Sequence, residues 1–270
     1  MEIKSLLTKS GIEQVCHIAE KAGAVILEYY RKDIAVETKS DNTPVTEADL
    51  KASELIVAAL EKLTPEIPVL SEESEGITWS QRKSWSCLWL VDPLDGTKEF
   101  VKRRDEFTVN IALIVDSEPV LGVVYAPVYD HMYFAFSGHG AFFRDQKGQV
   151  SSMGVSESIG KPIRVLGSRS YLNDQTQAFL SRMGDYQLVQ MGSSLKSCAV
   201  ASGQGDLYPR LGPTSEWDTA AAQCIVEEAG GVLVNRDLKP LKYNQKESLL
   251  NPHFFVCAKD NFHWHKYLFD

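Results

Sequence analysis

The sequence predicts a protein of the mixed α/β (α+β) class with two lobes. Three patterns carry this prediction: apolar residues at helical spacing near the N-terminus, a central run of strands, and a second half in which strands and helices alternate. The 270 residues, of which 44% are hydrophobic, are enough to bury a large core.

The N-terminal third predicts two helices followed by strands. Apolar residues recur at helical spacing from Val15 to Tyr29 and from Ala48 to Leu63. Thr46, three residues before Asp49, is typical of a capping residue at a helix start. Apolar runs that end in polar or acidic residues predict strands at 69–70, 88–91 and 107–115.

The remaining chain predicts an antiparallel meander and then an α/β lobe. The meander runs from Val109 to Phe143, with turns at 116–118 and 137–140. After a polar stretch at 146–161, strands are expected at 163–167, 187–191, 206–211 and 232–234, with helices at 174–183, 194–201 and 219–229. We place an N-terminal lobe at 1–150 and a C-terminal lobe at 151–270, although a surface loop within one domain explains the polar stretch equally well.

Composition excludes several classes of partner. A net charge of −8 and a pI of about 5.3 disfavour nucleic acid held on a broad basic surface. No apolar run approaches the ~18 residues of a membrane span, so we expect no integral membrane segment. The five scattered cysteines form no C-x-x-C pair and predict reduced thiols in a cytoplasmic protein.

Asp92 and Asp95 form the most informative motif, because both follow the predicted strand 88–91 within one turn. Two carboxylates at ~4 Å repel by about 4 kcal/mol at an effective dielectric constant of 20, which a divalent cation would offset. Hard oxygen ligands without a neighbouring histidine or cysteine favour Mg²⁺ over Zn²⁺. Taken alone, the motif is explained equally well by a surface turn.

Gly96 and Thr97 strengthen the functional interpretation of this segment. A glycine that allows close backbone approach, followed by a hydroxyl and a short helix, suits a phosphate group. The two residues between Asp92 and Asp95 argue against a phosphoaspartate intermediate, whose motif has a single intervening residue. They favour a metal-activated water.

Glu72 and Asp218 are individually unremarkable. Glu72 follows a short apolar run and could be solvated surface charge, whereas Asp218 lies at a predicted helix start, where the helix dipole favours an aspartate. However, strands that end at the same edge of a sheet bring together acidic residues that follow separate apolar runs in the sequence. Together they predict one metal site.

Four motifs in order resemble the magnesium-dependent, lithium-sensitive phosphatases of the inositol monophosphatase superfamily. These motifs are Val45–Asp49, Ser71–Glu73, Asp92–Thr97 and Trp217–Ala221. The sequence of the segment Leu90–Phe100, in which Lys98 and Glu99 follow the D-G-T motif, is similar to the corresponding segment of the CysQ-type 3′(2′),5′-bisphosphate nucleotidases of that superfamily. The resemblance implies a sugar-phosphatase-like sandwich with alternating helix and sheet layers.

The same resemblance implies the roles of individual residues. Two or three Mg²⁺ ions would be held by Glu72, Asp92, the carbonyl of Leu94, Asp95 and Asp218. Asp49, Glu72 and Thr97 would place and deprotonate the attacking water. Substrate contacts would come from Gly96, Thr97, Ser193, Ser194, Lys196 and Arg210, together with Glu72, Leu94, Asp95 and Asp218.

The implied reaction is removal of the 3′-phosphate of adenosine 3′,5′-bisphosphate (PAP), giving AMP and phosphate. The adenylylated sulfate precursor PAPS is a further candidate substrate, and sulfate assimilation is the implied setting. An inositol monophosphatase or sugar bisphosphatase of the same superfamily is the alternative. A cation-binding regulator without activity is disfavoured, because Asp49 and Thr97 serve water activation. The resemblance also leaves open a homodimer and peripheral attachment to the cytoplasmic face of the inner membrane.

Overall fold

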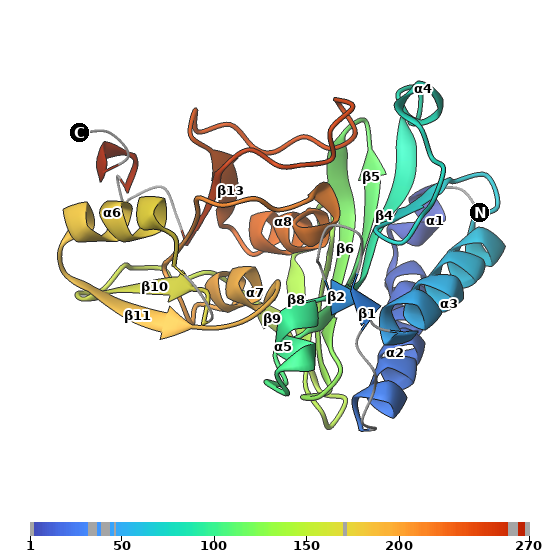
Figure 1. Cartoon of the computed structure of the whole chain (residues 1–270), viewed down its shortest axis with the longest axis horizontal. Helices are drawn as coiled ribbons and strands as arrows, with labels where there is room; N and C mark the ends of the chain where they lie inside the picture. The colour runs from blue at the N-terminus through green and yellow to red at the C-terminus, as the bar shows by residue number, and fades with distance from the viewer. Residues whose placement is uncertain are drawn as a thin grey trace.

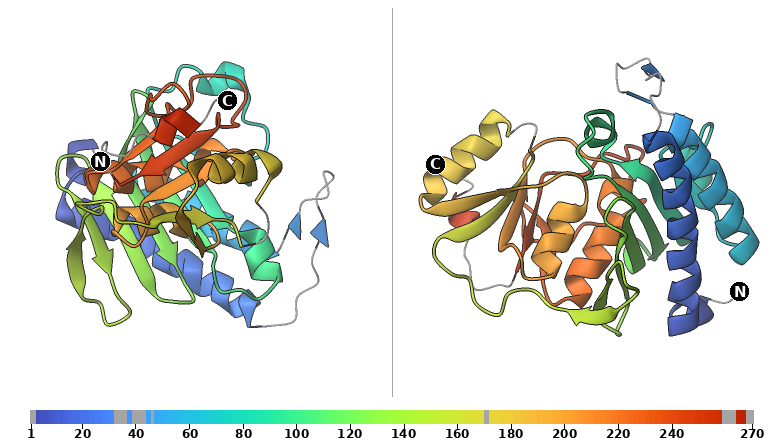
Figure 2. Two further views of the ribbon diagram at one scale, coloured as in Figure 1. Left: turned by 90° about the vertical axis from the view of Figure 1, so that its left-hand side faces the viewer. Right: turned by 90° about the horizontal axis from the view of Figure 1, so that it is seen from below.

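Helices and sheets alternate in five layers in the computed structural model, which describes residues 3–31, 37–38, 44–45, 47–169, 172–258 and 264–267 (Figures 1 and 2). Helices α2 (Lys9–Tyr30) and α3 (Glu47–Leu63) form the first layer and cover a seven-stranded sheet. Helices α7 (Leu195–Ala201) and α8 (Ala220–Glu228) separate it from a five-stranded sheet. Helix α6 (Asp174–Met183) and the 3₁₀ turn η2 (Trp264–Tyr267) cover the far side. The predicted layered fold is confirmed.

The seven-stranded sheet has the order β3-β4-β5-β6-β7-β8-β9, and only the β3–β4 pair is parallel. The strands are β3 (Val69–Ser71), β4 (Cys87–Asp95), β5 (Thr108–Val115), β6 (Glu118–Ala126), β7 (His131–Phe136), β8 (Ala141–Arg144) and β9 (Val150–Met153). The predicted meander is confirmed. Strand β9 lies in the predicted polar stretch, where its mainly exposed residues give no apolar alternation, and it begins at the proposed lobe boundary.

The five-stranded sheet has the order β11-β10-β12-β14-β13, with β10 parallel to both of its neighbours and β14 antiparallel to both of its own. The strands are β10 (Ile163–Gly167), β11 (Tyr186–Gln190), β12 (Leu207–Arg210), β13 (Val232–Asn235) and β14 (Phe254–Cys257). Four of these strands match predicted ones. Strand β14 was missed because its four apolar residues follow a long irregular segment.

Three apolar clusters fill the spaces between the layers. On β4, Trp89 and Val91 pack towards α2 and α3, whereas Leu88 and Leu90 pack towards α7 and α8. This alternation follows from the two-residue repeat of a strand. Each fully buried apolar side chain of this size contributes about 1.5–3 kcal/mol, so both faces of the sheet stabilise the fold.

Gly122 on β6 allows α8 to lie directly on the sheet. A Cβ atom at this position would lie 2.2 Å from the carbonyl oxygen of Ala221, a distance that no side chain could accommodate. The close approach matters for the site, because the 3₁₀ turn η1 (Glu216–Asp218) immediately precedes α8 and carries Asp218.

The remaining elements are short. They are α1 (Ile3–Leu6), the paired β1 (Glu37–Thr38) and β2 (Pro44–Val45), α4 (Trp79–Arg82) and α5 (Thr97–Val101). The capping residue predicted at Thr46 lies outside the described residues. Among the described helices, none combines the length and apolar character needed to cross a bilayer.

Candidate active site

The paired aspartates lie at a β-bulge near the end of β4. Asp92 pairs with Asn110 and Asp95 with Thr108, so three residue steps on β4 oppose two on β5. Such a bulge changes the direction of the side chains beside it. Pro93 is tolerated there because the ladder of hydrogen bonds is interrupted at the bulge, so the missing N–H of proline is not needed. The strand therefore continues to Asp95 instead of ending at Val91 in a plain turn. The backbone N–H of Leu94 donates to Asp92 Oδ1 at 3.1 Å.

Gly96 turns the chain from β4 into α5. Its φ of 96° lies in the left-handed region, which only glycine adopts readily. Thr97, the first residue of α5, donates its hydroxyl to the carbonyl of Leu94 at 3.4 Å. The predicted short helix after the D-G-T motif is therefore present, and the Thr97 hydroxyl reaches back to the bulge.

Two further carboxylates reach this strand end from other elements. Glu72 follows β3, and its backbone N–H still pairs with the carbonyl of Val91. Asp218 ends η1, where the backbone N–H of Ser215 donates to Asp218 Oδ2 at 2.9 Å. The first turn of α3 contributes Asp49, which is 2% exposed.

A cavity of about 390 Å³, here called the acidic pocket, lies over the bulge. It is lined by Glu72, Asp92, Leu94, Asp95, Gly96, Thr97 and Asp218, and also by Lys98, Glu99, Pro213, Thr214, Ser215, Trp217 and Leu250. Every predicted metal ligand is therefore among its lining residues. Asp49 is not, although its charge acts on Asp92.

Burial and neighbouring carboxylates raise the pKa values of two aspartates in the acidic pocket. Burial raises the pKa of Asp92 well above its ordinary value, and the charges of Glu72, Asp95, Asp218 and Asp49 raise it further. The pKa of Asp218 rises to about 7, first because of burial and then because of Asp95. The site therefore disfavours the charged forms of Asp92 and Asp218 as long as no cation is nearby.

This donor set fits Mg²⁺. The pocket offers carboxylate, hydroxyl and carbonyl oxygens, with no histidine or cysteine among the described residues that line it. In the described part of the chain, no three His, Cys, Asp or Glu side chains already lie at the spacing of metal ligands.

A second cavity of about 470 Å³, the adjoining pocket, shares Asp95, Gly96, Lys98, Glu99, Pro213, Thr214 and Asp218 with the first. The predicted contacts Ser193, Ser194, Lys196 and Arg210 all line it. The remaining wall includes Ser168, Leu172, Asn173, Thr176, Tyr208 and Phe254. Asp95 therefore faces two compartments.

Ser194 connects these compartments. Its backbone N–H donates to Asp95 Oδ2 at 2.6 Å, and its hydroxyl oxygen lies 2.8 Å from the same carboxylate oxygen. The hydroxyl oxygen also lies 2.9 Å from the carbonyl oxygen of Asp218 and accepts from Asn110 Nδ2 at 3.0 Å. Three segments that are distant in sequence are thereby fixed around Asp95.

Two of the three cationic residues that line the adjoining pocket, Lys196 and Arg210, donate to neutral carbonyl groups. Lys196 Nζ donates to the carbonyl of Ser193 at 2.6 Å and lies 5.3 Å from the centre of the Tyr208 ring. Arg210 Nη2 donates to the carbonyl of Pro213 at 2.8 Å, while its Nε is buried without a hydrogen bond. Carbonyls do not cancel the charge of either cation, and Asp95, Glu99 and Asp218 line the same pocket.

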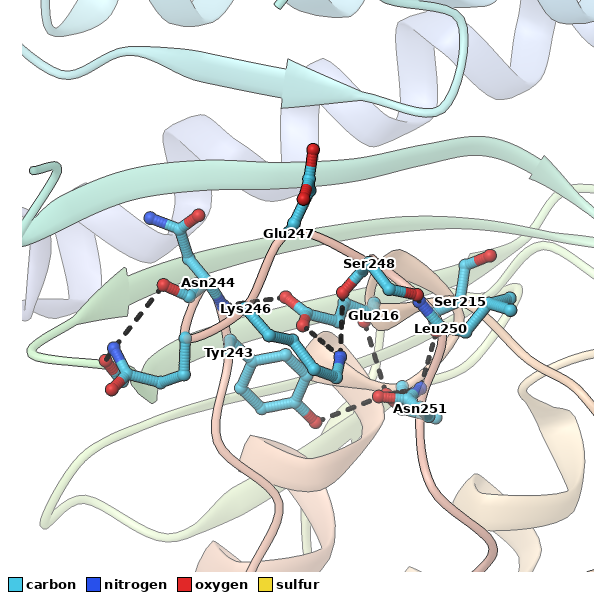
Figure 3. A network of polar contacts seen from close by, with 12 residues as sticks. Ser215, Glu216, Tyr243, Asn244, Lys246, Glu247, Ser248, Leu250 and Asn251 are labelled. Carbon is cyan, nitrogen blue, oxygen red and sulfur yellow. Dashed lines mark hydrogen bonds and ion pairs between the residues drawn. The ribbon is translucent and has the colours of Figure 1, made fainter. Parts of the chain in front are cut away.

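A buried polar network supports the turn that carries Asp218 (Figure 3). Glu216, 0% exposed, accepts from the backbone N–H of Asn244 at 2.7 Å and from Lys246 Nζ at 3.1 Å. Asn251 Nδ2 donates to the carbonyl of Ser215 at 2.6 Å. Buried Arg82 donates to Asn244 Oδ1 at 2.8 Å, which ties the network to α4.

Comparison with known proteins identifies the family. A profile of the inositol monophosphatase family matches residues 9–264. The chain belongs to the inositol monophosphatase family. The predicted membership of this superfamily is therefore confirmed.

Similar members of the family include curated bacterial proteins. The 3′(2′),5′-bisphosphate nucleotidase CysQ of Salmonella typhimurium is 47% identical over 247 residues, which are 91% of this chain and 98% of that protein. The CysQ of Escherichia coli strain K12 is 46% identical over the same share of each chain. The predicted similarity to the CysQ-type branch is confirmed.

Solved structures of the family share the fold. The crystal structure of CysQ from Bacteroides thetaiotaomicron superposes with a TM-score of 0.81 at 39% identity, covering 94% of this chain and 98% of the other. The extragenic suppressor protein suhB from Bartonella henselae gives 0.79 at 26% identity, covering 96% and 98%.

The motifs did not identify the residues that support the site. Asn110 had a visible signal, because it is a polar residue within the apolar run 107–115 and is 1% exposed. Glu216 lies beside the recognised Asp218, yet its partners come from residues 244–246. Glu106, which precedes β5, forms an ion pair with Arg169, which follows β10 in the other sheet. No pattern in the sequence indicated this pair.

Proposed function

We propose that the protein is a magnesium-dependent phosphomonoesterase that removes the 3′-phosphate of adenosine 3′,5′-bisphosphate, giving AMP and phosphate. One observation carries this proposal: Asp95 is shared by a pocket of carboxylates and a pocket bearing Lys98, Lys196 and Arg210. A substrate with two phosphates needs one site for the scissile group and another for the second anion. The CysQ name of the similar proteins supports the same substrate.

The carboxylates of the acidic pocket would hold the metal. Glu72, Asp92, the carbonyl of Leu94, Asp95 and Asp218 are the proposed ligands for two or three Mg²⁺ ions. Bound Mg²⁺ would lower the pKa of the attacking water and neutralise charge on the phosphate. The raised pKa of Asp92 supports this assignment, because a nearby cation would relieve the repulsion that raises it.

The chain's own groups would orient the reactants. The backbone of Gly96 and Thr97 would hold the scissile phosphate, and the Thr97 hydroxyl would position the water. Asp49 and Glu72 would accept the proton from that water. The hydrogen bond from Thr97 to the Leu94 carbonyl supports this assignment, because it aims the hydroxyl at the bulge.

The second phosphate and the nucleoside would occupy the adjoining pocket. Lys196 and Arg210 would bind the anion, with hydrogen bonds from Ser193 and Ser194. The buried Nε of Arg210, which has no hydrogen bond, supports its assignment as a donor to a ligand.

The expected location is the cytoplasm, and a homodimer stays a prediction of the resemblance.

The substrate is tested by measuring phosphate release from three compounds in parallel. Adenosine 3′,5′-bisphosphate, inositol 1-phosphate and fructose 1,6-bisphosphate are each supplied with Mg²⁺, with and without Li⁺. We expect the highest kcat/KM with the adenosine compound and inhibition by Li⁺. A preference for inositol 1-phosphate or fructose 1,6-bisphosphate would overturn the substrate assignment, and no release from any compound would overturn the enzymatic one.

A further inference from the structure

Glu106 makes an ion pair that joins the two sheets beside the adjoining pocket. It lies between α5 and β5 and is 8% exposed, whereas Arg169 follows β10 in the other sheet. Arg169 Nη2 donates to Glu106 Oε1 at 2.6 Å and Arg169 Nε to Oε2 at 3.1 Å. Such a two-point contact fixes orientation as well as distance.

The same carboxylate also holds the start of the segment that carries the proposed anion contacts. The backbone N–H of Gly192 donates to Glu106 Oε2 at 2.9 Å. Arg169 Nη2 additionally donates to the carbonyl of Gln190 at 3.2 Å, at the end of β11. Both sides of this chain turn are therefore attached to one ion pair.

The backbone of Glu106 lies against two glycines. A Cβ atom on Gly96 would lie 3.1 Å from the carbonyl oxygen of Glu106, and one on Gly192 would lie 2.7 Å from that same oxygen. Gly96 is the first residue of the proposed scissile-phosphate site, and Gly192 immediately precedes the Ser193–Lys196 segment. Residue 106 therefore lies against the start of both segments.

The segment after Gly192 has little freedom of its own. Ser193 has a φ of 45°, which is rarely adopted by residues other than glycine. Its carbonyl accepts from Lys196, and the next residue, Ser194, donates to Asp95. A shift of Gly192 would therefore move Lys196 relative to Asp95.

We infer that Glu106 and Arg169 are positioning residues that set the spacing between the scissile-phosphate site and the second anion site. This inference rests on the proposed function, which it deepens. A fixed spacing favours a substrate with two phosphates at that separation, and it gives no advantage to a monoester with a single phosphate. The pair therefore selects for a bisphosphate without touching it.

The test uses Arg169→Met and a matched control, Arg164→Met. Arg164 also lies on this sheet and makes a similar pair with buried Asp206, at 2.6 and 3.0 Å. Arg164 is not among the residues that line either pocket. KM and kcat are measured for adenosine 3′,5′-bisphosphate and for p-nitrophenyl phosphate, which has one phosphate.

We expect Arg169→Met to raise KM for the bisphosphate about tenfold while kcat for it changes less than about twofold, because misplaced binding groups mainly weaken binding. Activity on p-nitrophenyl phosphate should stay unchanged, and Arg169→Lys should recover part of the lost affinity. Arg164→Met should lower thermal stability and leave both KM values unchanged.

An unchanged bisphosphate KM in Arg169→Met would overturn the inference, and so would an equal loss with both substrates. Failure of the proposed function can be distinguished from failure of this inference, because a wrong substrate assignment is already visible in the activity of the wild-type protein. If the wild type prefers fructose 1,6-bisphosphate, the same ratio of KM values tests the pair on that compound. If it hydrolyses no bisphosphate, both proposals are overturned.

Discussion

The acidic pocket and the adjoining pocket share a wall, yet they handle charge differently. In the acidic pocket, carboxylates face one another and raise the pKa values of Asp92 and Asp218. In the adjoining pocket, Lys196 and Arg210 donate to the backbone carbonyls of Ser193 and Pro213. The difference teaches why we propose a cation for the first pocket and an anion for the second.

Each pocket also depends on a buried glutamate outside it. Glu216 supports the turn with Asp218 and accepts from Asn244 and Lys246. Glu106 supports the turn before Ser193 and accepts from Arg169 and Gly192. The supports lie in different parts of the chain, so each support can be removed without removing the other.

The largest expected effect comes from Asp95→Asn, which removes one of the carboxylates that line both pockets. We expect kcat/KM at saturating Mg²⁺ to fall by about 10³-fold, equivalent to ~4 kcal/mol, because a proposed metal ligand is lost. The asparagine oxygen can still accept from Ser194, so the thermal midpoint should change little. Asp116→Asn, in the turn between β5 and β6, is the control and should retain full activity. Near wild-type turnover in Asp95→Asn would contradict the proposed metal site.

Much of the acidic pocket could be predicted from the sequence because its proposed metal ligands lie in short segments. Asp92, Leu94 and Asp95 come from one strand end, and Glu72 comes from the parallel strand beside it. Local order along the chain therefore fixes most of the arrangement. The layered fold was predictable for the same reason, since helical spacing and strand alternation are local patterns.

The supports of both pockets could not be predicted because their partners are distant in sequence. Glu106 and Arg169 are 63 residues apart, and Arg82 reaches Asn244 across 162 residues. No spacing rule connects such positions. The bulge at Pro93 was hidden as well, because it depends on the register between β4 and β5.

The next largest effect tests the support of the acidic pocket alone. Arg82→Met removes donors to Asn244 Oδ1 and to the carbonyls of Lys246 and Glu247. Leaving the buried Asn244 Oδ1 and two partly buried carbonyls without this donor should lower the free energy of unfolding by about 3 kcal/mol, measured by urea denaturation. Lys83→Met, at the exposed neighbouring position, should cost less than about 0.5 kcal/mol.

The same variant separates the two pockets functionally. Because Asn244 contacts Glu216, we expect the Mg²⁺ concentration for half-maximal activity to rise in Arg82→Met. KM for the bisphosphate at saturating Mg²⁺ should stay within about twofold, since the adjoining pocket has its own support. A change in KM without a change in Mg²⁺ requirement would refute the separate supports.

The smallest effect concerns the charge gathered in the acidic pocket. The pKa of Asp218 is raised from 3.8 to about 7, so the folded state binds this proton more tightly than the unfolded state does. The stability associated with it is present below pH 4 and is lost as the pH rises through 7. In EDTA-treated protein, the free energy of unfolding should therefore fall by roughly 2 kcal/mol between pH 5.5 and pH 7.0 because of this group, at about 1.4 kcal/mol per pH unit.

Asp218→Asn isolates this contribution from that of Glu227, whose pKa burial raises to about 6. The variant cannot lose the Asp218 proton, so its stability should fall less steeply over the same interval. Its advantage over the wild type should be greatest above pH 7, where the wild-type carboxylates are charged. Equal slopes for both proteins would show that Asp218 already carries its charge at pH 5.5, and the carboxylates of the acidic pocket would then not be poised for a cation by mutual repulsion.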